Sequence, residues 1–393
     1  MFRLLQLNAV DSATLGADLQ HQLPAPASLL IATGNVASMQ ALDGLHAPER
    51  FAAHWIACSS CLGAASAGGV DAPSDRRLSA LVLTDPLGSY GVASVRQRPG
   101  EVQQQAAATV LAAIARAGRT AELPGLIWCM QAPGFEEQVI SGIQQVVGDQ
   151  VQILGGSAAD DDVSGQWCQY DGQRLGTDLL VIAVLYPTVP VSSYFSSGYS
   201  TGHASGTVTA VRGRQVLQID DLPALEVYNR WLQQAGLAPL QSGVVMSAST
   251  FHPIGRTLHA SDVPFSLLSL PVSAGSDGSI TLLAELQQGD EISLMHGSRE
   301  QLIRRASHVV QVAGNTLRLK HDRPPAAALI VYCAGCMLAV REHINEVQSS
   351  LSQSLPALPY LVAFTYGEQG CFADGYNRHG NLMISAVLFG QPK

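Results

Sequence analysis

Residues 126–156, LIWCMQAPGFEEQVISGIQQVVGDQVQILGG, decide the fold class of this chain. The stretch opens on a short apolar run, residues 126–130, and closes on a second one, residues 151–154, which ends in two glycines. The segment between them, residues 134–147, is predicted to be a helix, because its acidic first turn suits the positive end of a helix dipole. Strand, helix and strand in succession are typical of an α/β protein.

The same alternation continues on both sides of this stretch. Further strands are predicted at 28–33, 55–57, 78–84, 179–186, 207–211, 215–219, 265–271, 280–285, 291–295, 327–332, 360–366 and 382–389. Further helices are predicted at 101–117, 223–234, 300–312 and 341–355. The sequence contains no low-complexity tract and no short-period repeat.

The prolines of 187–190 and the glycine- and serine-rich segment 196–206 interrupt this pattern near the middle of the chain. We therefore predict two tandem domains, residues 25–200 and 201–390. The short strands joined by tight turns beyond residue 206 favour antiparallel pairing. The expected fold is mixed α/β (α+β), with largely antiparallel or mixed sheets flanked by helices.

Composition excludes several classes of protein. Of the 393 residues 47% are hydrophobic and 13% are charged, which is enough apolar material for real cores. The net charge is −9 and there is no basic run, so nucleic acids and anionic membrane surfaces are poor partners. The longest apolar stretches, 179–185 and 326–340, are shorter than the roughly 20 residues that cross a bilayer.

The first 20 residues and the cysteines indicate the compartment. Asp11 interrupts the N-terminal segment before any signal-peptide core develops. Seven cysteines, an odd number in a long chain, favour reduced thiols over a disulfide framework. We expect a cytoplasmic protein.

An ordered set of motifs resembles the FIST family, a two-part sensory module of bacterial signalling proteins that also occurs fused to an F-box in eukaryotes. In chain order the motifs are CSSCLG at 58–63, LGGSAADD at 154–161, VTAVRGRQVLQIDDLPALEVY at 208–228, PIG at 253–255, DGS at 277–279, VYCAGC at 331–336, TYGE at 365–368, and His379. Two positions depart from the family pattern. Cys336 stands where the family usually has arginine, and Gly380-Asn381 stands where an asparagine-threonine pair often follows the late histidine.

The resemblance implies sensing without catalysis, in which a small ligand is bound and the signal passes to a kinase, cyclase or chemoreceptor. The two parts use the whole chain, so we expect it to act through a separate partner such as a histidine kinase. Free-standing FIST proteins include a group that binds haem, senses nitric oxide and controls a histidine kinase. This chain is similar to that group in being free-standing, so a haem b sensor of nitric oxide is the favoured hypothesis. A homodimer is compatible with such a sensor.

A haem iron needs an imidazole or thiolate ligand in an apolar pocket. His203 lies at the predicted domain junction, where ligand sites favour clefts, and His252 is held by the proline that follows it. These two histidines are the predicted iron ligands. His259 and His54 are further candidates, and for each one a hydrogen-bonded structural histidine is the competing interpretation. The absence of Cys-x-x-Cys-His excludes covalent haem attachment.

The motifs also define a candidate ligand site formed by residues Gly155, Gly156, Ser157, Cys333, Glu368 and His379. The alternative to haem is an amino-acid-like ligand held by Glu368 and the backbone of 154–158. A third hypothesis is a thiol-dependent enzyme that uses Cys333 or Cys58, although no catalytic spacing supports it. The pairs Cys58/Cys61 and Cys333/Cys336 also allow a zinc site, but they lie far apart in apolar contexts.

Overall fold

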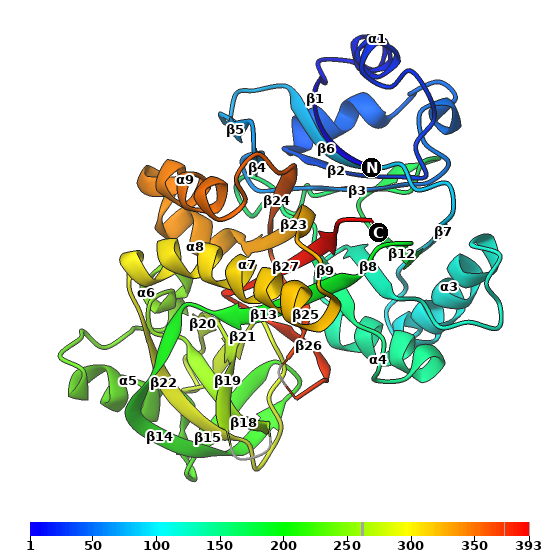
Figure 1. The fold of residues 1–393 in the computed structure, drawn as a ribbon. Helices are drawn as coiled ribbons and strands as arrows, with labels where there is room; N and C mark the ends of the chain where they lie inside the picture. Colours follow the sequence, from blue (N-terminus) through cyan, green and yellow to red (C-terminus); the bar gives the residue numbers. More distant parts are fainter. Residues whose placement is uncertain (261–262, 373, 393) are drawn as a thin grey trace.

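The computed structural model describes residues 1–260, 263–372 and 374–392, and the side chains of these except residues 259, 260, 263 and 264. Four sheets of mixed or antiparallel strands, each flanked by helices, make up the described structure (Figure 1). The prediction of a mixed α/β fold is therefore confirmed.

One four-stranded unit occurs three times along the described chain, although no repeat is visible in the sequence. In each unit the first strand pairs antiparallel with the fourth, the fourth antiparallel with the second, and the second parallel with the third. The first unit contains β1 (Phe2–Asn8), β2 (Leu29–Gly34), β3 (Trp55–Ser59) and β6 (Arg77–Leu83). The second contains β7 (Ser89–Arg96), β8 (Leu126–Gln131), β9 (Ile153–Ser157) and β12 (Leu179–Tyr186). The third contains β13 (Val191–Ser197), β23 (Pro325–Cys333), β24 (Tyr360–Thr365) and β27 (Met383–Gly390).

Helices follow the first and second strands of each unit and cover the outer face of its sheet. They are α1 (Ser12–Gln22) and α2 (Val36–Met39), then α3 (Val102–Arg116) and α4 (Glu136–Val147), then α7 (Arg299–His321) and α9 (Ile344–Ser354). Shorter helical turns are η1 (Gln40–Leu42), η2 (Pro48–Arg50), α8 (Ala334–Ala339) and η3 (Arg341–His343). Each helix pair has its own apolar core against its sheet.

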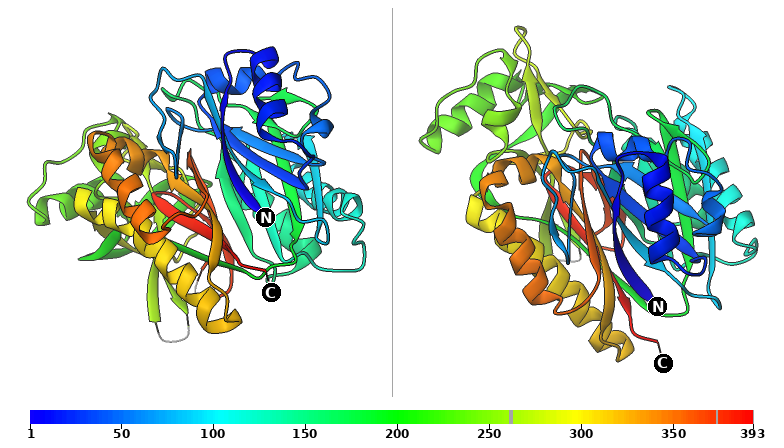
Figure 2. Two further views of the ribbon diagram at one scale, coloured as in Figure 1. Left: turned by 45° about the horizontal axis from the view of Figure 1, so that its top comes forward. Right: turned by 90° about the horizontal axis from the view of Figure 1, so that it is seen from above.

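The inner faces of the three sheets meet in one central core. Alternate residues of β2 illustrate the arrangement, because Ile31 belongs to this core whereas Leu30 packs toward α1. Trp128 and Phe389 enter the same core from the second and third units. Strands buried on both faces explain why the sequence shows continuous apolar runs. The two termini lie near each other (Figure 2), and the rings of Phe2 and Phe389 are 4.9 Å apart.

In each unit the segment between the third and fourth strands forms a hairpin that pairs with a strand of another unit. The hairpin β4 (Ala64–Ser66)/β5 (Gly69–Val70) pairs with β24 of the third unit. The hairpin β10 (Gln169–Tyr170)/β11 (Leu175–Gly176) pairs with β3 of the first unit. The hairpin β25 (Glu368–Cys371)/β26 (Asn377–Gly380) pairs with β9 of the second unit. The predicted domains 25–200 and 201–390 therefore share strands.

An inserted domain separates the first strand of the third unit from its first helix (Figure 1). Its elements are β14 (Tyr199–Arg212), β15 (Gln215–Ile219), β16 (Leu222–Pro223), α5 (Ala224–Gln234), β17 (Gly243–Val244), α6 (Met246–Ser249), β18 (Ile254–Ala260), β19 (Val263–Ser269), β20 (Pro271–Ala274), β21 (Ile280–Leu282) and β22 (Glu291–Gly297). Its strands form one antiparallel sheet, and Tyr228 and Trp231 of α5 pack on the core of that sheet. The insertion lies against the second and third units and so creates the candidate site.

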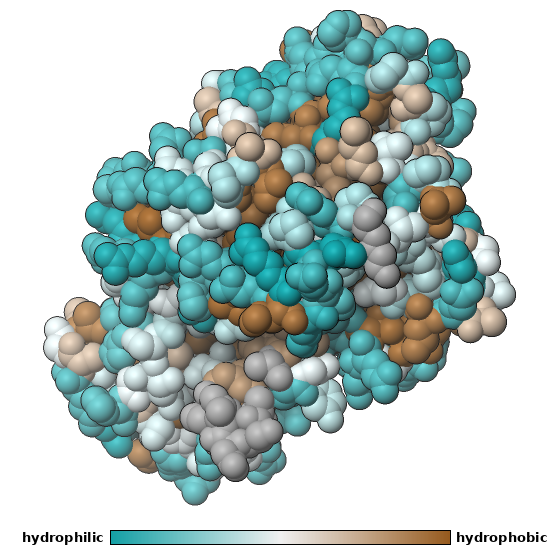
Figure 3. Space-filling view, viewed as in Figure 1, coloured by the Kyte–Doolittle hydropathy of each residue, from teal (hydrophilic) through white to brown (hydrophobic). Residues whose placement is uncertain are grey.

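No helix in the described part of the chain is both long and apolar enough to cross a membrane. Figure 3 shows hydrophilic side chains along the outer face of α7, with small hydrophobic patches around it.

Candidate functional site

The most apolar cavity described lies where the second unit, the third unit and the inserted domain meet. Its volume is about 510 Å³. We call it the Glu136 cavity; its lining residues are Pro133, Gly134, Glu136, Val163, Trp167, Arg214, Val244, Met246, Leu270, Val272, Ser273, Leu283, Cys333, Gly335, Leu338, Tyr366, His379 and Asn381. A mainly apolar wall with few polar groups is the usual character of a small-molecule site.

Four ionisable side chains form a compact cluster at one wall of this cavity. The Nη2 atom of Arg214, in the turn between β14 and β15, lies 2.7 Å from Glu136 Oε2 and 2.6 Å from Glu137 Oε2. The Nδ1 atom of His379, on β26, lies 3.0 Å from Glu137 Oε1. We call Glu136, Glu137, Arg214 and His379 the Glu136 cluster. It joins the second unit, the third unit and the insertion through charge-assisted hydrogen bonds, the strongest polar contacts in proteins.

The charges of the cluster follow from this geometry. Burial alone raises the pKa of both glutamates, but His379 and Arg214 outweigh it, so each pKa lies below its ordinary value. The glutamates also raise the pKa of Arg214, which keeps the guanidinium charged. Two carboxylates and one guanidinium give the cluster a net charge of −1 while His379 is neutral, and zero when His379 is protonated.

The backbone and side chains around Glu136 hold its carboxylate in place. Ser157 Oγ donates a hydrogen bond to Glu136 Oε1 at 2.6 Å, and the backbone N–H of Gly134 donates to the same oxygen at 3.0 Å. On the other side of the cluster, Asn381 Nδ2 lies 3.5 Å from His379 Nε2. Since Nδ1 faces an ionised carboxylate and carries the proton in the neutral ring, Nε2 is then a hydrogen-bond acceptor.

Cys333 and Glu368 lie next to each other on the third-unit side of the cavity. Cys333 is the last residue of β23 and lines the cavity, whereas Glu368 is fully buried behind it on β25. A hydrogen bond with Cys336 and burial raise the pKa of the Cys333 thiol. Burial and the nearby Cys333 also raise the pKa of Glu368, which accepts hydrogen bonds from the Thr365 hydroxyl at 3.1 Å and the Met383 N–H at 3.1 Å. Glu368 is therefore a buried, satisfied group outside the cavity wall.

The two glycines of the 154–161 motif allow close packing and do not line the cavity. Gly155 has a φ of +141°, and a Cβ atom there would lie 1.8 Å from the carbonyl oxygen of Cys129. A Cβ atom on Gly156 would lie 2.7 Å from Thr365 Oγ1. Of the six predicted ligand-site residues, His379 and Cys333 line the cavity, Ser157 supports Glu136 from behind, and the other three lie outside the wall.

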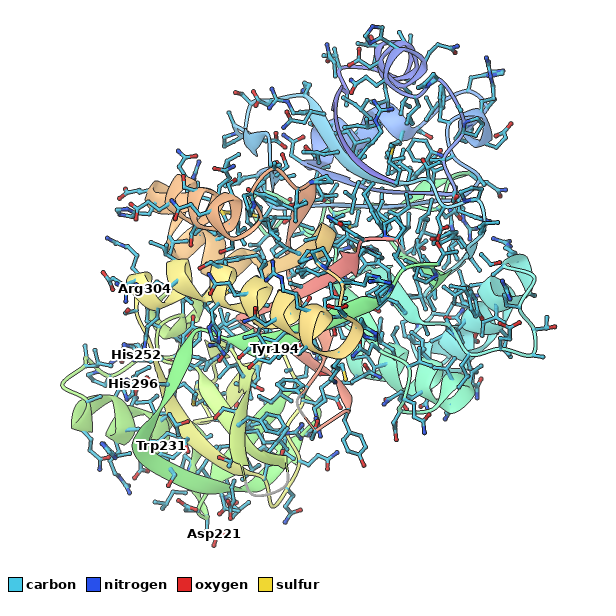
Figure 4. The ribbon with its side chains drawn as sticks, viewed as in Figure 1. Tyr194, Asp221, Trp231, His252, His296 and Arg304 are labelled. Carbon is cyan, nitrogen blue, oxygen red and sulfur yellow. The ribbon has the colours of Figure 1, made fainter. Side chains whose placement is uncertain are left out.

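The predicted haem ligands do not line the Glu136 cavity. His203 lies exposed on β14. His252 is half-buried beside His296 in the inserted domain (Figure 4), with ring centroids 5.4 Å apart, and burial and His296 lower its pKa. The side chain of His259 lies outside the described residues. His54 lines a different, polar cavity together with Arg116 and Asp171. The described residues thus place none of the predicted iron ligands in this apolar cavity, and the haem prediction stays untested.

The two Cys-x-x-Cys pairs do not form a shared metal site among the described residues. One group of three or more side chains with metal-ligand geometry is found there, Glu136, Glu137 and His379. Arg214 already binds both of these carboxylates, so a cation would have to displace its guanidinium.

The sequence interpretation missed the main charged residues of the site. The acidic first turn that contains Glu136 and Glu137 was explained by the helix dipole, and Arg214 falls in the turn between the predicted strands 207–211 and 215–219. Arg214 and Glu136 are 78 residues apart in sequence. No local pattern could have paired them, because the contact exists only once the insertion packs on α4.

Three solved structures that resemble this chain are distant likenesses. A cyanuric acid hydrolase from A. caulinodans is 9% identical, with a TM-score of 0.31 over 52% of this chain and 78% of that chain. A second cyanuric acid hydrolase structure, described as an evolutionary innovation by structural concatenation, is 9% identical, with a TM-score of 0.36 over 99% of both chains. T. maritima PurL complexed with ATP is 10% identical, with a TM-score of 0.20 over 99% of this chain and 71% of that one. TM-scores this low say nothing about what this chain does.

Comparison with sequences and family descriptions is more informative. No curated protein matches this sequence. The FIST N domain matches residues 29–222, and the FIST C domain matches residues 224–371. Together they include the motifs from Cys58 to Glu368 and the charged residues 136, 137 and 214 of the cluster. The chain belongs to the FIST family, as a protein with both FIST N and FIST C domains and a sensory role.

Proposed function

We propose that this FIST protein is a non-enzymatic sensor that binds one small, mainly apolar molecule in the Glu136 cavity and passes the signal to a partner such as a histidine kinase. The observation that carries this proposal is the cavity itself, which joins about 510 Å³ of mainly apolar space to one charged cluster. Trp167, Leu270 and Leu338 give it apolar walls contributed by all three surrounding parts of the fold. Such a cavity suits recognition, since its few polar groups orient a ligand whose body is held by apolar contacts.

The cluster selects the polar end of the ligand. With a neutral His379 the net charge of the Glu136 cluster is −1. Arg214 is already bound to both carboxylates, so the cluster offers an anionic ligand no unpaired cation. A donor fits better, because the Nε2 atom of His379 is an acceptor whose nearest partner, Asn381, lies at 3.5 Å. The ligand class is therefore a small apolar molecule with an amine or other donor at one end. This class includes the amino-acid-like ligands expected from the sequence, although Glu368 is not their anchor.

The state of the thiols supports a role without catalysis. Burial raises the pKa of Cys58 and of Cys61 to about 12, and the pKa of Cys333 is also raised. A nucleophilic cysteine needs the thiolate form near neutral pH, which calls for a lowered pKa. The thiol-enzyme hypothesis therefore has no support from these sites.

The alternative to an amine ligand is haem b, which would make the protein a sensor of nitric oxide. The one described histidine that lines the Glu136 cavity is His379, and both of its ring nitrogens already face protein groups, Glu137 and Asn381. An axial ligand held by a carboxylate would suit iron chemistry, but this ring would first have to release Asn381. The same binding experiment decides between the two ligand classes.

The experiment is a thermal-shift series on the full chain with phenethylamine, phenylalanine, phenylacetate and haemin. A ligand that binds only the folded state raises the melting temperature with its concentration. We expect phenethylamine to stabilise the protein by binding in the Glu136 cavity, and phenylacetate to gain nothing from that cavity. A haemin shift accompanied by a Soret band that responds to nitric oxide would favour the haem alternative.

Two tryptophan variants test where the ligand binds. Leu338→Trp would fill part of the cavity, because Leu338 lines it and is 40% exposed. Leu319→Trp on α7 is the matched control, since Leu319 is exposed and lines none of the cavities described. The amine shift should disappear in Leu338→Trp and persist in Leu319→Trp. An equal amine shift in both variants, or a phenylacetate shift that Leu338→Trp abolishes and Leu319→Trp keeps, would contradict the proposal.

A further inference from the structure

Two adjoining cavities lie between the N-terminal part of α7 and the strands β13 and β14. Their volumes are about 460 Å³ and 340 Å³, and both are lined by Ser197, Tyr199 and Arg305. We call them together the α7 groove. It shares no lining residue with the Glu136 cavity, and it has the opposite electrostatic character.

Arg305 is the central cation of the α7 groove. Its side chain is half-buried and donates a hydrogen bond to the hydroxyl of Ser196. Its Nε–H is buried and has no acceptor among the described residues, and no described carboxylate lies within ion-pair distance of the guanidinium. Burial lowers the pKa of Arg305, which reflects the cost of a charge without a counter-ion.

The rest of the groove adds positive charge and no negative charge. Arg304 and His308 line the smaller cavity, and neither cavity has an aspartate or glutamate among its described lining residues. Tyr194, whose ring centroid is 6.4 Å from that of His308, lines the larger cavity. Figure 4 shows Tyr194 close to α7 and Arg304 near the N-terminal end of this helix. A single acidic group in solution would therefore find several cationic or hydroxyl partners here.

The larger cavity has an aromatic wall that suits a planar ring. The ring of Phe372 lies 4.8 Å from that of Phe195 and 5.0 Å from that of Phe265, measured between centroids. Hydroxyl groups lie around the same space, on Ser196, Ser197, Ser200, Thr201 and Ser266. Aromatic side chains favour a ring stacked on them or meeting them edge-on, and hydroxyls can complete the hydrogen bonds of a carboxylate.

We propose that the α7 groove is a second ligand site, which binds a small aromatic carboxylate. The ring occupies the larger cavity against Phe372 and Phe265, and the carboxylate pairs with the guanidinium of Arg305. A planar guanidinium matches a carboxylate with two parallel hydrogen bonds, which would also satisfy the buried Nε–H. Arg304, which lines the smaller cavity, strengthens the local positive potential that attracts the anion. This inference does not depend on the ligand of the Glu136 cavity.

Anthranilate, a fluorescent aromatic carboxylate, is a direct probe of the groove. We expect saturable binding of one anthranilate per chain, and at least about tenfold weaker binding of the neutral amide anthranilamide, because a charge-assisted pair is lost. Arg305→Gln should weaken anthranilate binding by a similar factor of about ten. Arg318→Gln on the same helix is the matched control, because Arg318 lies outside the groove and should leave binding unchanged.

A second variant keeps the test decisive if Arg305→Gln fails to fold. Thr201→Trp adds bulk at an exposed residue that lines the larger cavity, so it should block anthranilate while leaving the circular dichroism spectrum unchanged. Equal binding of anthranilate and anthranilamide would overturn the proposal, as would undiminished anthranilate binding by folded Thr201→Trp. Phenethylamine stabilisation should be unaffected by Thr201→Trp, which separates this site from the Glu136 cavity.

Discussion

Replacing Arg214 by glutamine removes the one guanidinium that faces both Glu136 and Glu137. The two carboxylates lie 2.7 and 2.6 Å from its Nη2 atom, and the Glu136 side chain is only 3% exposed. Removing one partner of a buried ion pair costs about 3–5 kcal/mol, because the other charge stays buried without compensation. The Arg214 side chain is 22% exposed, so water can replace part of the contact. We expect the free energy of unfolding at pH 7 to fall by about 3 kcal/mol, the lower end of that range.

The lowered pKa values of the two glutamates predict how the loss of stability in Arg214→Gln changes with pH. In the wild type both glutamate pKa values are lowered, so the stability they contribute is present above their unfolded pKa of about 4.3 and is lost as the pH falls. In Arg214→Gln one of the two cations that offset burial is lost while His379 stays, so the pKa of Glu136 is higher than in the wild type. Less of this stability is then present above the unfolded pKa. The stability difference between the two proteins should therefore be largest at pH 7 and shrink towards pH 4.5.

Thermal unfolding followed by circular dichroism at both pH values measures this difference. For a chain of 393 residues a loss of about 3 kcal/mol corresponds to a melting temperature about 4 °C lower. Arg230→Gln is the control, since Arg230 and Glu226 form an exposed pair at 3.1 Å, and such pairs contribute about 1 kcal/mol or less. Adding Glu136→Gln to Arg214→Gln should recover part of the loss. A shift no larger than that of Arg230→Gln, or equal shifts at pH 7 and pH 4.5, would refute the reasoning.

Three further predictions concern buried groups. Relative to the wild type, Glu368→Gln should gain in melting temperature as the pH rises from 4 to 9, because a raised folded-state pKa destabilises the fold above the unfolded pKa of about 4.3. A difference between the two melting temperatures that stays constant over this range would contradict this. Gly155→Ala should destabilise the protein, because its Cβ would overlap the carbonyl oxygen of Cys129. Gly314→Ala inside α7 should stabilise it by up to about 1 kcal/mol, because alanine favours a helix more than glycine does and a Cβ has room there. Thermal melts of both variants measure the two effects. Iodoacetamide at pH 7 should label the half-buried Cys371 well before Cys333, as mass spectrometry of the digested protein would show; rapid labelling of Cys333 would revive the thiol-enzyme hypothesis.

Local sequence patterns predicted most secondary structure because each depends on near neighbours. The predicted strand 126–130 and the predicted helix 134–147 match β8 and α4 closely. The strand predicted at 151–154 lies two to three residues too early, because β9 runs from Ile153 through both glycines to Ser157. The predicted helix 300–312 was too short, because α7 continues to His321. Gly314 and Asn315 obscure its apolar face in the sequence, yet Ala313 and Leu317 remain buried against the sheet. The first strand and helix, β1 and α1, had no strong local signal and were not predicted.

The candidate site was only partly accessible from the sequence. His379 and Cys333 were found through family motifs, and both line the cavity. The charged partners that give the site its chemistry were not found, because Arg214 contacts Glu136 only through the packing of the insertion against α4. Ion pairs between distant segments leave no periodic signal in either segment.

The sequence by itself determined the alternation of strands and helices, the breaks at glycine and proline, the acidic balance and the family. The tertiary structure decided how these elements combine into three equivalent units that exchange hairpins, as when β25 of the third unit pairs with β9 of the second. The physical reason is that strands pair through backbone hydrogen bonds, which every residue except proline can both donate and accept. A strand with the same alternation of side chains can join any free sheet edge. The choice of edge, and with it the position of the cavity, depends on the packing of the whole chain.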